Sequence, residues 1–403
     1  MSRVTPQSDL PPVSLPVQRT CPFHPPPELG ELREQAPLRR LLYDGGQVGW
    51  LVTSHGLARA VLLDDRFSVR SGLQQMQVHF PLQVWLADNP PVGSMLAMDA
   101  PEHTRYRRLL ANRYTVSRAS ALRPRIEEIV EGQLDVLEQA AQPADLVELF
   151  ALPIPSLVSC ELLGIPLEMS PDIVRNASVS LSLTSSVDEA GAAVRDTRAL
   201  FRQFVADKRR HLTDDIASYL ISSGELQDDE LAGLIAFLHI AGFEAPANAL
   251  ALGAFKLLCD PDLMNRMRAD PSLLGNAVDE FLRYLTPHQF GITRTALEDV
   301  ELDGQLIKAG ECVTVSLPAA NRDPRKFDNP DELDLTRKAV QQLAFGQGVH
   351  MCLGQHVSRV MLQAAWPGLL RRFPRLRLAV PMEDLHLRSD MLIYGVHQLP
   401  VEW

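Results

Sequence analysis

The chain has 403 residues, 46% of them hydrophobic, and a formal net charge of −11 from 39 basic and 50 acidic residues. It is long enough to bury a large core, and its acidic balance argues against a nucleic-acid-binding protein. Its five scattered cysteines lack Cys-x-x-Cys spacing, which disfavours a disulfide framework or a zinc site and fits a reducing cytoplasm.

The N-terminal segment is rich in proline, with eight prolines in residues 1–27. Because proline disfavours both helix and central strand, we expect an extended leader there. No apolar run in it is long enough for a signal peptide or a membrane span, so we expect a soluble protein. After Gly45-Gly46, the apolar run Trp50-Leu51-Val52-Thr53 predicts a strand that follows a hairpin turn.

Residues 70–97 mix apolar side chains with helix breakers and show no sustained period, which predicts a long loop. A loop of this length is usually functional, although a packed surface loop is the alternative. Pro101 then starts a predicted helix in which His103 and Arg107 share one face at i,i+4 spacing. Taken alone, that pair is typical of a solvated helix face.

A long apolar helix is predicted from Asp228-Asp229-Glu230 to Cys259, roughly 48 Å at 1.5 Å per residue. Pro246 interrupts it at a cost of roughly 3 kcal/mol and leaves the carbonyl of Gly242 without its usual helical donor. A later helix beginning near Ser272 places Glu280 and Arg283 at i,i+3 spacing, where an exposed pair would contribute under about 1 kcal/mol.

Cys352 follows Phe345 and the glycines at 346 and 348, and an amphipathic helical pattern follows it, with an interruption predicted at Trp366-Pro367. The cysteine thus lies where a tight loop becomes a helix, and helix N-terminal N–H groups stabilise a thiolate. These features favour a metal-bound thiolate. The alternative is an inert buried thiol, which is the common state of a free cysteine.

This segment resembles the haem-binding signature of cytochromes P450, Phe-x-x-Gly-x-x-x-Cys-x-Gly, and matches it at Phe345, Gly348, Cys352 and Gly354. The resemblance extends over about residues 28–403. It implies one mainly α domain with a small β region, a triangular helical prism that encloses haem b (iron protoporphyrin IX). Cys352 would be the axial thiolate ligand of the iron.

The resemblance also assigns other residues near the haem. His103, Arg107, Arg294 and His350 would bind its propionates through charge-assisted hydrogen bonds. Residues 70–97, with His288, Phe290 and Ile292, would line the substrate pocket; the alternative for His288 is a satisfied polar residue. Residues 172–200 would form a helix-loop-helix lid. The Glu280-x-x-Arg283 pair would bind a downstream arginine, for which Arg322 is the expected partner.

The middle of the long helix resembles the family's oxygen-activating segment, Ala-Gly-x-Asp/Glu-Thr. Gly242 and Glu244 match, but Ala245 stands where the family has threonine. Losing a positioned proton donor typically costs about 10²–10⁴ in rate. We therefore expect proton delivery through ordered water, with Glu244 and a substrate hydroxyl taking part. The alternative is that Ala245 and Pro246 only bend the helix, with oxygen activation impaired or replaced.

The resemblance implies a soluble, cytoplasmic, monomeric monooxygenase that receives electrons from ferredoxin and ferredoxin reductase. Arg105, Arg108, Arg113 and Arg118 form a local basic patch, and our hypothesis is that part of it binds an acidic ferredoxin by electrostatic complementarity. The expected substrate is a specialised metabolite, first of all a macrolide or another polyketide. One alternative is an oxidase acting on a carrier-protein-bound or aromatic substrate, and another is a haem-based binding or sensing protein without turnover.

Overall fold

A computed structural model describes residues 10–403, and the statements below concern those residues. The fold is mainly helical, as predicted. The α-helices are α1 (Pro27–Gln35), α2 (His55–Leu63), α3 (Pro81–Asp88), α4 (Glu102–Ala111), α5 (Val116–Ala121), α6 (Arg123–Gln139), α7 (Pro153–Leu163), α8 (Ser170–Ser180), α9 (Val187–Lys208), α10 (Ile216–Ser223), α11 (Asp228–Leu258), α12 (Pro261–Ala269), α13 (Leu274–Leu285), α14 (Leu317–Ala320) and α15 (Gln355–Arg372).

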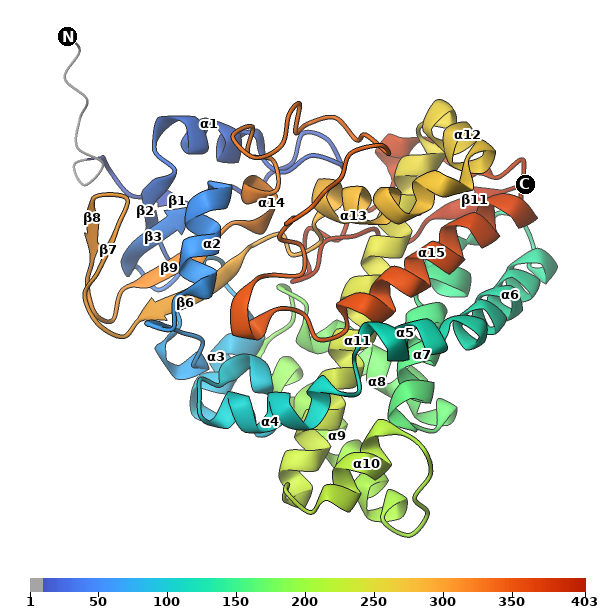
Figure 1. The fold of residues 1–403 in the computed structure, drawn as a ribbon, viewed down its shortest axis with the longest axis horizontal. Helices are drawn as coiled ribbons and strands as arrows, with labels where there is room; N and C mark the ends of the chain where they lie inside the picture. Colours follow the sequence, from blue (N-terminus) through green and yellow to red (C-terminus); the bar gives the residue numbers. More distant parts are fainter. Residues whose placement is uncertain (1–9) are drawn as a thin grey trace.

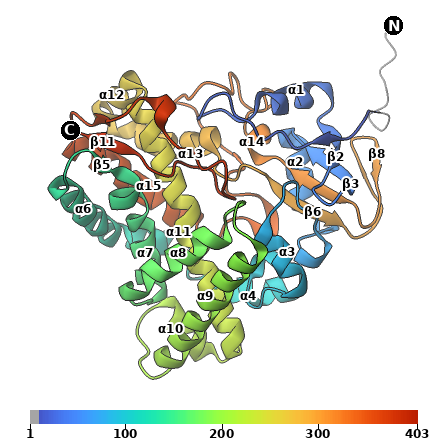
Figure 2. The same cartoon turned by 180° about the vertical axis from the view of Figure 1, so that it is seen from behind.

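The β structure is small and lies in two places: the six-stranded sheet and the β7–β8 pair are at one side of the molecule, and β5 and β11 are at the opposite side, beside α6 (Figures 1 and 2). A six-stranded sheet has the order β1-β2-β3-β9-β6-β4, a three-stranded sheet the order β10-β11-β5, and β7 pairs with β8. The strands are β1 (Val13–Ser14), β2 (Leu38–Leu42), β3 (Val48–Val52), β4 (Phe67–Ser68), β5 (Ala144–Asp145), β6 (Ile292–Ala296), β7 (Val300–Leu302), β8 (Gln305–Ile307), β9 (Cys312–Val315), β10 (Arg377–Leu378) and β11 (Pro400–Glu402).

The strand predicted around Trp50 is confirmed as β3, which forms an antiparallel hairpin with β2 and runs parallel to β9, with Trp50 opposite Val313. The described part of the proline-rich segment contacts this sheet at one end and the main helical core at the other. Val13 of β1 pairs in parallel with Leu41 of β2, and Phe23 is buried in the main core. Residues 1–9 of the expected leader lie outside the described residues.

Helix α11 runs through the middle of the molecule in both views (Figures 1 and 2). A capping box between Gln227 and Glu230 fixes its start, and Pro246 lies inside it, so the predicted long helix is confirmed. By length and composition α11 is apolar enough to cross a membrane. However, 72% of its most apolar window is buried inside the protein, which identifies it as the central core helix.

Helix α15 shares the main hydrophobic core with α11, and its largest buried side chain contacts that helix directly. Trp366 lies over Gly253, where a Cβ would collide with the indole ring, and its Nε1 donates to the carbonyl of Leu250 at 3.1 Å. The interruption expected at Trp366-Pro367, a kink, does not end the helix, because α15 continues to Arg372 with Pro367 inside it. Burial of the Trp366 side chain against the core offsets the cost of an interior proline.

The prediction that residues 70–97 form one long loop is wrong in part, because α3 occupies the middle of that span. Pro81 occupies the start of the helix, where its fixed φ is favourable and its missing N–H costs nothing. Trp85 packs on Gly191 of α9, and the guanidinium group of Arg198 lies 5.5 Å from the centre of its ring. The predicted helix-loop-helix of residues 172–200 is present as α8 and α9.

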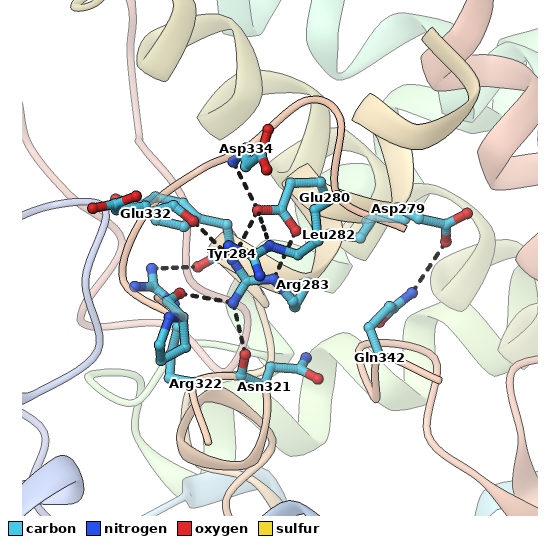
Figure 3. Close-up of polar contacts among 12 residues, drawn as sticks. Asp279, Glu280, Leu282, Arg283, Tyr284, Asn321, Arg322, Glu332, Asp334 and Gln342 are labelled. Atoms are coloured by element: carbon cyan, nitrogen blue, oxygen red, sulfur yellow. Dashed lines mark hydrogen bonds and ion pairs between the residues drawn. The ribbon is translucent and has the colours of Figure 1, made fainter. Parts of the chain in front are cut away.

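A buried ionic network fixes the end of α13 (Figure 3). The side chains of Glu280 and Arg283 are fully buried and joined by two hydrogen bonds, of 2.7 and 2.9 Å. Arg283 also donates to the carbonyls of Asn321, Pro330 and Glu332. The pair is therefore internal rather than exposed, and its lone pairs and protons are well matched.

The downstream arginine expected to join this pair is not Arg322. Its guanidinium stacks 3.8 Å above the Tyr284 ring, donates to the carbonyls of Tyr284 and Phe23 and pairs with Asp331 at 2.8 Å, which directs it away from Glu280. Arg337 occupies that role instead, with its Nε 3.0 Å from the Glu280 carboxylate. The Glu280 carboxylate also accepts the backbone N–H of Asp334 at 2.9 Å.

Candidate functional site

The loop before α15 places Cys352 at the start of a helix, as predicted. The backbone N–H of Cys352 donates to the carbonyl of Phe345 at 2.8 Å, which closes the loop. Gly348 has φ +77°, a conformation that favours glycine, and a Cβ there would collide with the carbonyl oxygen of Leu62. Glycine at this position is therefore required by backbone conformation and by close contact with α2.

Two opposing effects act on the Cys352 thiol. Burial raises its pKa, whereas the backbone N–H groups of Gly354 and Gln355 and the charge of Arg107 act to lower it. Cys352 lies deep in the protein, yet its side chain remains partly accessible, so it borders an internal space. The local donors are those that would stabilise a thiolate facing this space.

Four basic side chains from three separate elements meet beside this loop. Helix α4 contributes His103 and Arg107, β6 contributes Arg294, and the loop before Cys352 contributes His350. The imidazole rings of His103 and His350 are 4.1 Å apart, centre to centre. Arg294 and Arg107 both influence the titration of His350, so the four residues predicted from the sequence form one cluster.

The electrostatics of this cluster are unfavourable for the protein alone. Burial and the neighbouring charge of His103 lower the pKa of His350 to about 3, and burial lowers the pKa of Arg294 to about 10. Neither Arg107 nor Arg294 forms an ion pair within residues 10–403, and the buried Nε2 of His103 has no hydrogen-bond partner there. Arg294 donates to the Thr293 carbonyl at 3.0 Å, but the two guanidinium groups without a carboxylate and the unpartnered imidazole nitrogen of His103 together point to an anionic partner at this position.

The one nearby carboxylate is already engaged. The charge of Asp99 opposes the lowering of the pKa values of His103 and His350. Its carboxylate, however, already accepts hydrogen bonds from the Ser68 hydroxyl at 2.6 Å and the Val69 N–H at 2.9 Å. The cluster thus retains a surplus of donors. An internal space with a thiol at one side and unpaired guanidinium and imidazole groups at another fits a haem, whose two propionates are anionic.

The central helix borders an internal space as well. Ala241 is exposed and Ala245 is partly exposed, although the surrounding helix is buried, and the i,i+4 spacing puts both on one face. Gly242 lies close to α7, where a Cβ would come within 2.9 Å of the Ser159 hydroxyl oxygen. Small residues therefore keep this face open, and the Ala245 side chain has no hydroxyl group to contribute.

Glu244 lies one residue before Ala245 and is 5% exposed. Arg388 donates to its Oε1, and the Asn248 amide lies 3.4 Å from the same oxygen and 2.8 Å from the Glu244 carbonyl. Burial raises the pKa of Glu244, whereas Arg388 and Asn248 act to lower it. Glu244 is therefore a buried carboxylate in an ion pair, beside the face that Ala241 and Ala245 leave open.

The predicted pocket residues lie in different environments. His288 lies deep in the protein but is partly accessible, and its backbone forms a β-bridge with Ile393. Ile292 is also partly accessible, at the start of β6. Phe290, in contrast, is 4% exposed and packs in an apolar cluster beside the sheet, so it does not border an accessible space.

The predicted basic patch lies on α4, α5 and the turn between them, and it is partly neutralised within the chain. Arg105 forms an ion pair with Glu230, and Arg108 lies 2.6 Å from a carboxylate oxygen of Glu225. The guanidinium of Arg113 stacks 3.8 Å above the Tyr219 ring. Arg105 and Arg108 therefore have carboxylate partners within the described chain, and the prediction that part of this patch binds ferredoxin stays a prediction.

Sequence reasoning missed two residues that contact Glu244 and a buried histidine on α11. Asn248 follows Glu244 at i+4 and is detectable from helical spacing. Arg388 lies 144 positions away and gave no local signal. His239 is fully buried on α11, with its Nδ1 2.9 Å from the Ser159 hydroxyl, and burial lowers its pKa to about 4.

Comparison with known proteins agrees with this geometry. The family model described as Cytochrome P450 matches residues 179–385. Cytochrome P450 105C1 from Streptomyces sp. is 42% identical over 396 residues, which cover 97% of this chain and 99% of the relative.

Two solved structures share the fold over nearly the whole chain. CYP105P1 in complex with filipin I has a TM-score of 0.90 at 40% identity, covering 98% of this chain and 99% of its own. The mycinamicin VIII C21 methyl hydroxylase MycCI from Micromonospora griseorubida has a TM-score of 0.90 at 32% identity, covering 96% and 99%. The chain therefore belongs to the cytochrome P450 family, as a bacterial monooxygenase of the CYP105 group.

Proposed function

We propose that the protein inserts one oxygen atom from O2 into a specialised metabolite of the polyketide type, a macrolide first of all. The observation that carries this proposal is the buried basic cluster beside the Cys352 loop, which lacks an anionic partner within residues 10–403. The substrate class is supported by the relatives, since one is solved with filipin I and another is named as a hydroxylase bound to mycinamicin VIII.

The proposal assigns each cluster residue a part in holding haem b. Cys352 would be the thiolate ligand of the iron, and Phe345 and Gly348 would shape the loop that presents it. His103, Arg107, Arg294 and His350 would donate to the propionates and so satisfy the buried donors. When bound, the haem supplies the site for O2 activation, with the thiolate favouring O–O cleavage.

Protons would reach the site from Glu244 through water. Ala245 cannot donate a proton, and Pro246 leaves the Gly242 carbonyl free to hold a water molecule on the open face of α11. Glu244 lies next to this face as a buried, ion-paired carboxylate. A hydroxyl group of the substrate would complete the relay, which is consistent with a polyhydroxylated substrate class.

The experiment uses turnover with a surrogate ferredoxin and ferredoxin reductase, measuring product formed per NADPH consumed. Glu244→Gln keeps the shape of the side chain but cannot donate a proton as a carboxylic acid, and we expect coupling to fall by about 10² or more. Asn248→Ala, which keeps the carboxylate, serves as the matched variant. Unchanged coupling in Glu244→Gln would remove the carboxylate from the relay.

Substrate class is tested separately by titrating the ferric protein with polyketide lactones and with carrier-bound acids, following the absorbance of the haem. The proposal expects a spectral change with free polyketides. A response to carrier-bound acids alone would favour the oxidase alternative. We further propose that the protein works as a monomer in the cytoplasm, with ferredoxin as its reductant.

A further inference from the structure

Residues 386–397 form a hairpin near the C-terminus, called here the C-terminal hairpin. Leu387 and Val396 form a β-bridge across it, and the backbone N–H of Arg388 donates to the carbonyl of Gly395 at 3.0 Å. His397 closes its base by donating from its N–H to the His386 carbonyl at 2.9 Å. These bonds hold the two arms at a fixed separation, and the second arm is also bonded to the chain before β6 through the His288–Ile393 β-bridge and the Tyr394 N–H, which donates to the Pro287 carbonyl at 2.8 Å.

The tip of this hairpin is bonded to the loop between α8 and α9. The N–H of Leu183 donates to the Asp390 carbonyl at 2.9 Å, and the N–H of Leu392 donates to the Leu181 carbonyl at 3.0 Å. A β-bridge between Ser182 and Met391 lies between these two bonds. The α8–α9 loop and the hairpin tip thus form a short sheet-like contact through backbone atoms.

The first arm of the same hairpin places the Arg388 side chain beside Glu244. The two side chains are 13% and 6% exposed, and the buried Nε of Arg388 has no hydrogen-bond partner in the described part of the chain. Gln289 holds the backbone from the other side, because its Nε2 donates to the carbonyls of Arg388 at 3.3 Å and Met391 at 2.6 Å. Arg388 is therefore placed by the hairpin backbone, and its guanidinium has one carboxylate partner.

A buried ion pair depends strongly on its geometry, since removing one partner leaves the other charge desolvated and unpaired. Arg388 is the charged group that acts on Glu244, while Asn248 adds a neutral donor from its own helix. A displacement of the hairpin by one or two ångströms would separate the guanidinium from the carboxylate. Glu244 would then favour its neutral, protonated form.

We propose that Arg388 is a positioning residue that links the α8–α9 loop to Glu244: the ion pair forms when the loop is docked on the hairpin and is lost when the loop moves away. The loop of the lid would thereby set the protonation state of the carboxylate. This inference rests on the role of Glu244 in the proposed function, but it concerns a structural linkage that can be measured without substrate.

The test is an infrared titration of the substrate-free holoenzyme. The band of the protonated Glu244 carboxyl group is assigned by its absence in Glu244→Gln. Arg388→Gln should raise the proton affinity of Glu244 at least tenfold, and Arg388→Lys should restore most of the original value. Asp390→Asn, which removes the exposed ion pair with His397 on the same hairpin, should leave the titration unchanged.

The link to the loop is tested with a matched pair at Leu183. Both variants remove the leucine side chain. Leu183→Pro also removes the backbone N–H that donates to the Asp390 carbonyl, whereas Leu183→Ala keeps that N–H. We expect Leu183→Pro to shift the titration in the same direction as Arg388→Gln and Leu183→Ala to leave it in place. Equal titrations in the two Leu183 variants, or no shift in Arg388→Gln, would overturn the proposal. Because no turnover is involved, either failure is distinct from failure of the proposed function.

Discussion

His239 gives a quantitative prediction for the pH dependence of stability. The side chain is fully buried on α11, and burial lowers its pKa from 6.5 to about 4. Below pH 6.5 the unfolded chain binds a proton at this position that the folded chain does not bind until about pH 4. Stability from this group is therefore complete above pH 6.5 and falls as the pH is lowered.

The size of the effect follows from the shift. Each pKa unit corresponds to about 1.4 kcal/mol, so lowering the pH from 7 to 4.5 should cost the folded state about 2 to 3 kcal/mol through His239 alone. His239→Gln removes the titrating ring and keeps a polar side chain beside Ser159. The wild type should thus lose about 2 kcal/mol more than this variant over the same interval.

The assay is urea-induced unfolding at pH 7 and pH 4.5, followed by circular dichroism, with the free energy of unfolding compared between proteins. Carboxylates common to both proteins cancel in the difference. His211→Gln, at an exposed histidine, is the matched control and should lose as much stability as the wild type. An equal loss in His239→Gln and the wild type would refute the assignment of a buried neutral imidazole.

Three further predictions concern the core, the cysteine loop and the reductant. Glu280→Gln breaks a fully buried ion pair and should lower the free energy of unfolding by about 3–5 kcal/mol, whereas Glu131→Gln on the surface should change it by under about 1 kcal/mol in the same urea assay. Gly348→Ala introduces a Cβ that collides with a backbone carbonyl and should lower the haem content of the purified protein, while Gly56→Ala, where space is open, should not; equal haem content would contradict the close contact. Arg118→Glu reverses an exposed charge on α5 and should slow reduction by an acidic ferredoxin most at low salt in stopped-flow measurements; an unchanged rate would exclude this residue from the interface.

Residues with local signals were predictable from the sequence. Helix geometry explains why His103 and Arg107 share one face and how long α11 is, and turn chemistry explains the glycines before Cys352. The family signature then assigned these residues to one site. The structure brings His103, Arg107 and His350 together as that signature implies. Local sequence patterns thus located the site residues that lie on a helix or next to one.

Contacts set by tertiary packing were not predictable in the same way. Arg322 and Arg337 both follow α13, and only the stacking of Arg322 on Tyr284 decides which of them reaches Glu280. Helix α3 was hidden because Trp85 packs on Gly191 of a distant helix, a tertiary contact that the local sequence pattern does not reveal. Arg388 reaches Glu244 through the fold of the C-terminal hairpin, which no spacing along the chain reveals.

The central claim is that Cys352 ligates haem iron as a thiolate, and the absorption spectrum of the reduced protein under carbon monoxide tests it most directly. The wild type should show the Soret band of a thiolate-ligated haem, and Cys352→His should show that of a histidine-ligated globin. A wild-type spectrum like that of a globin, or a purified protein without porphyrin after expression with haem precursor, would contradict the account.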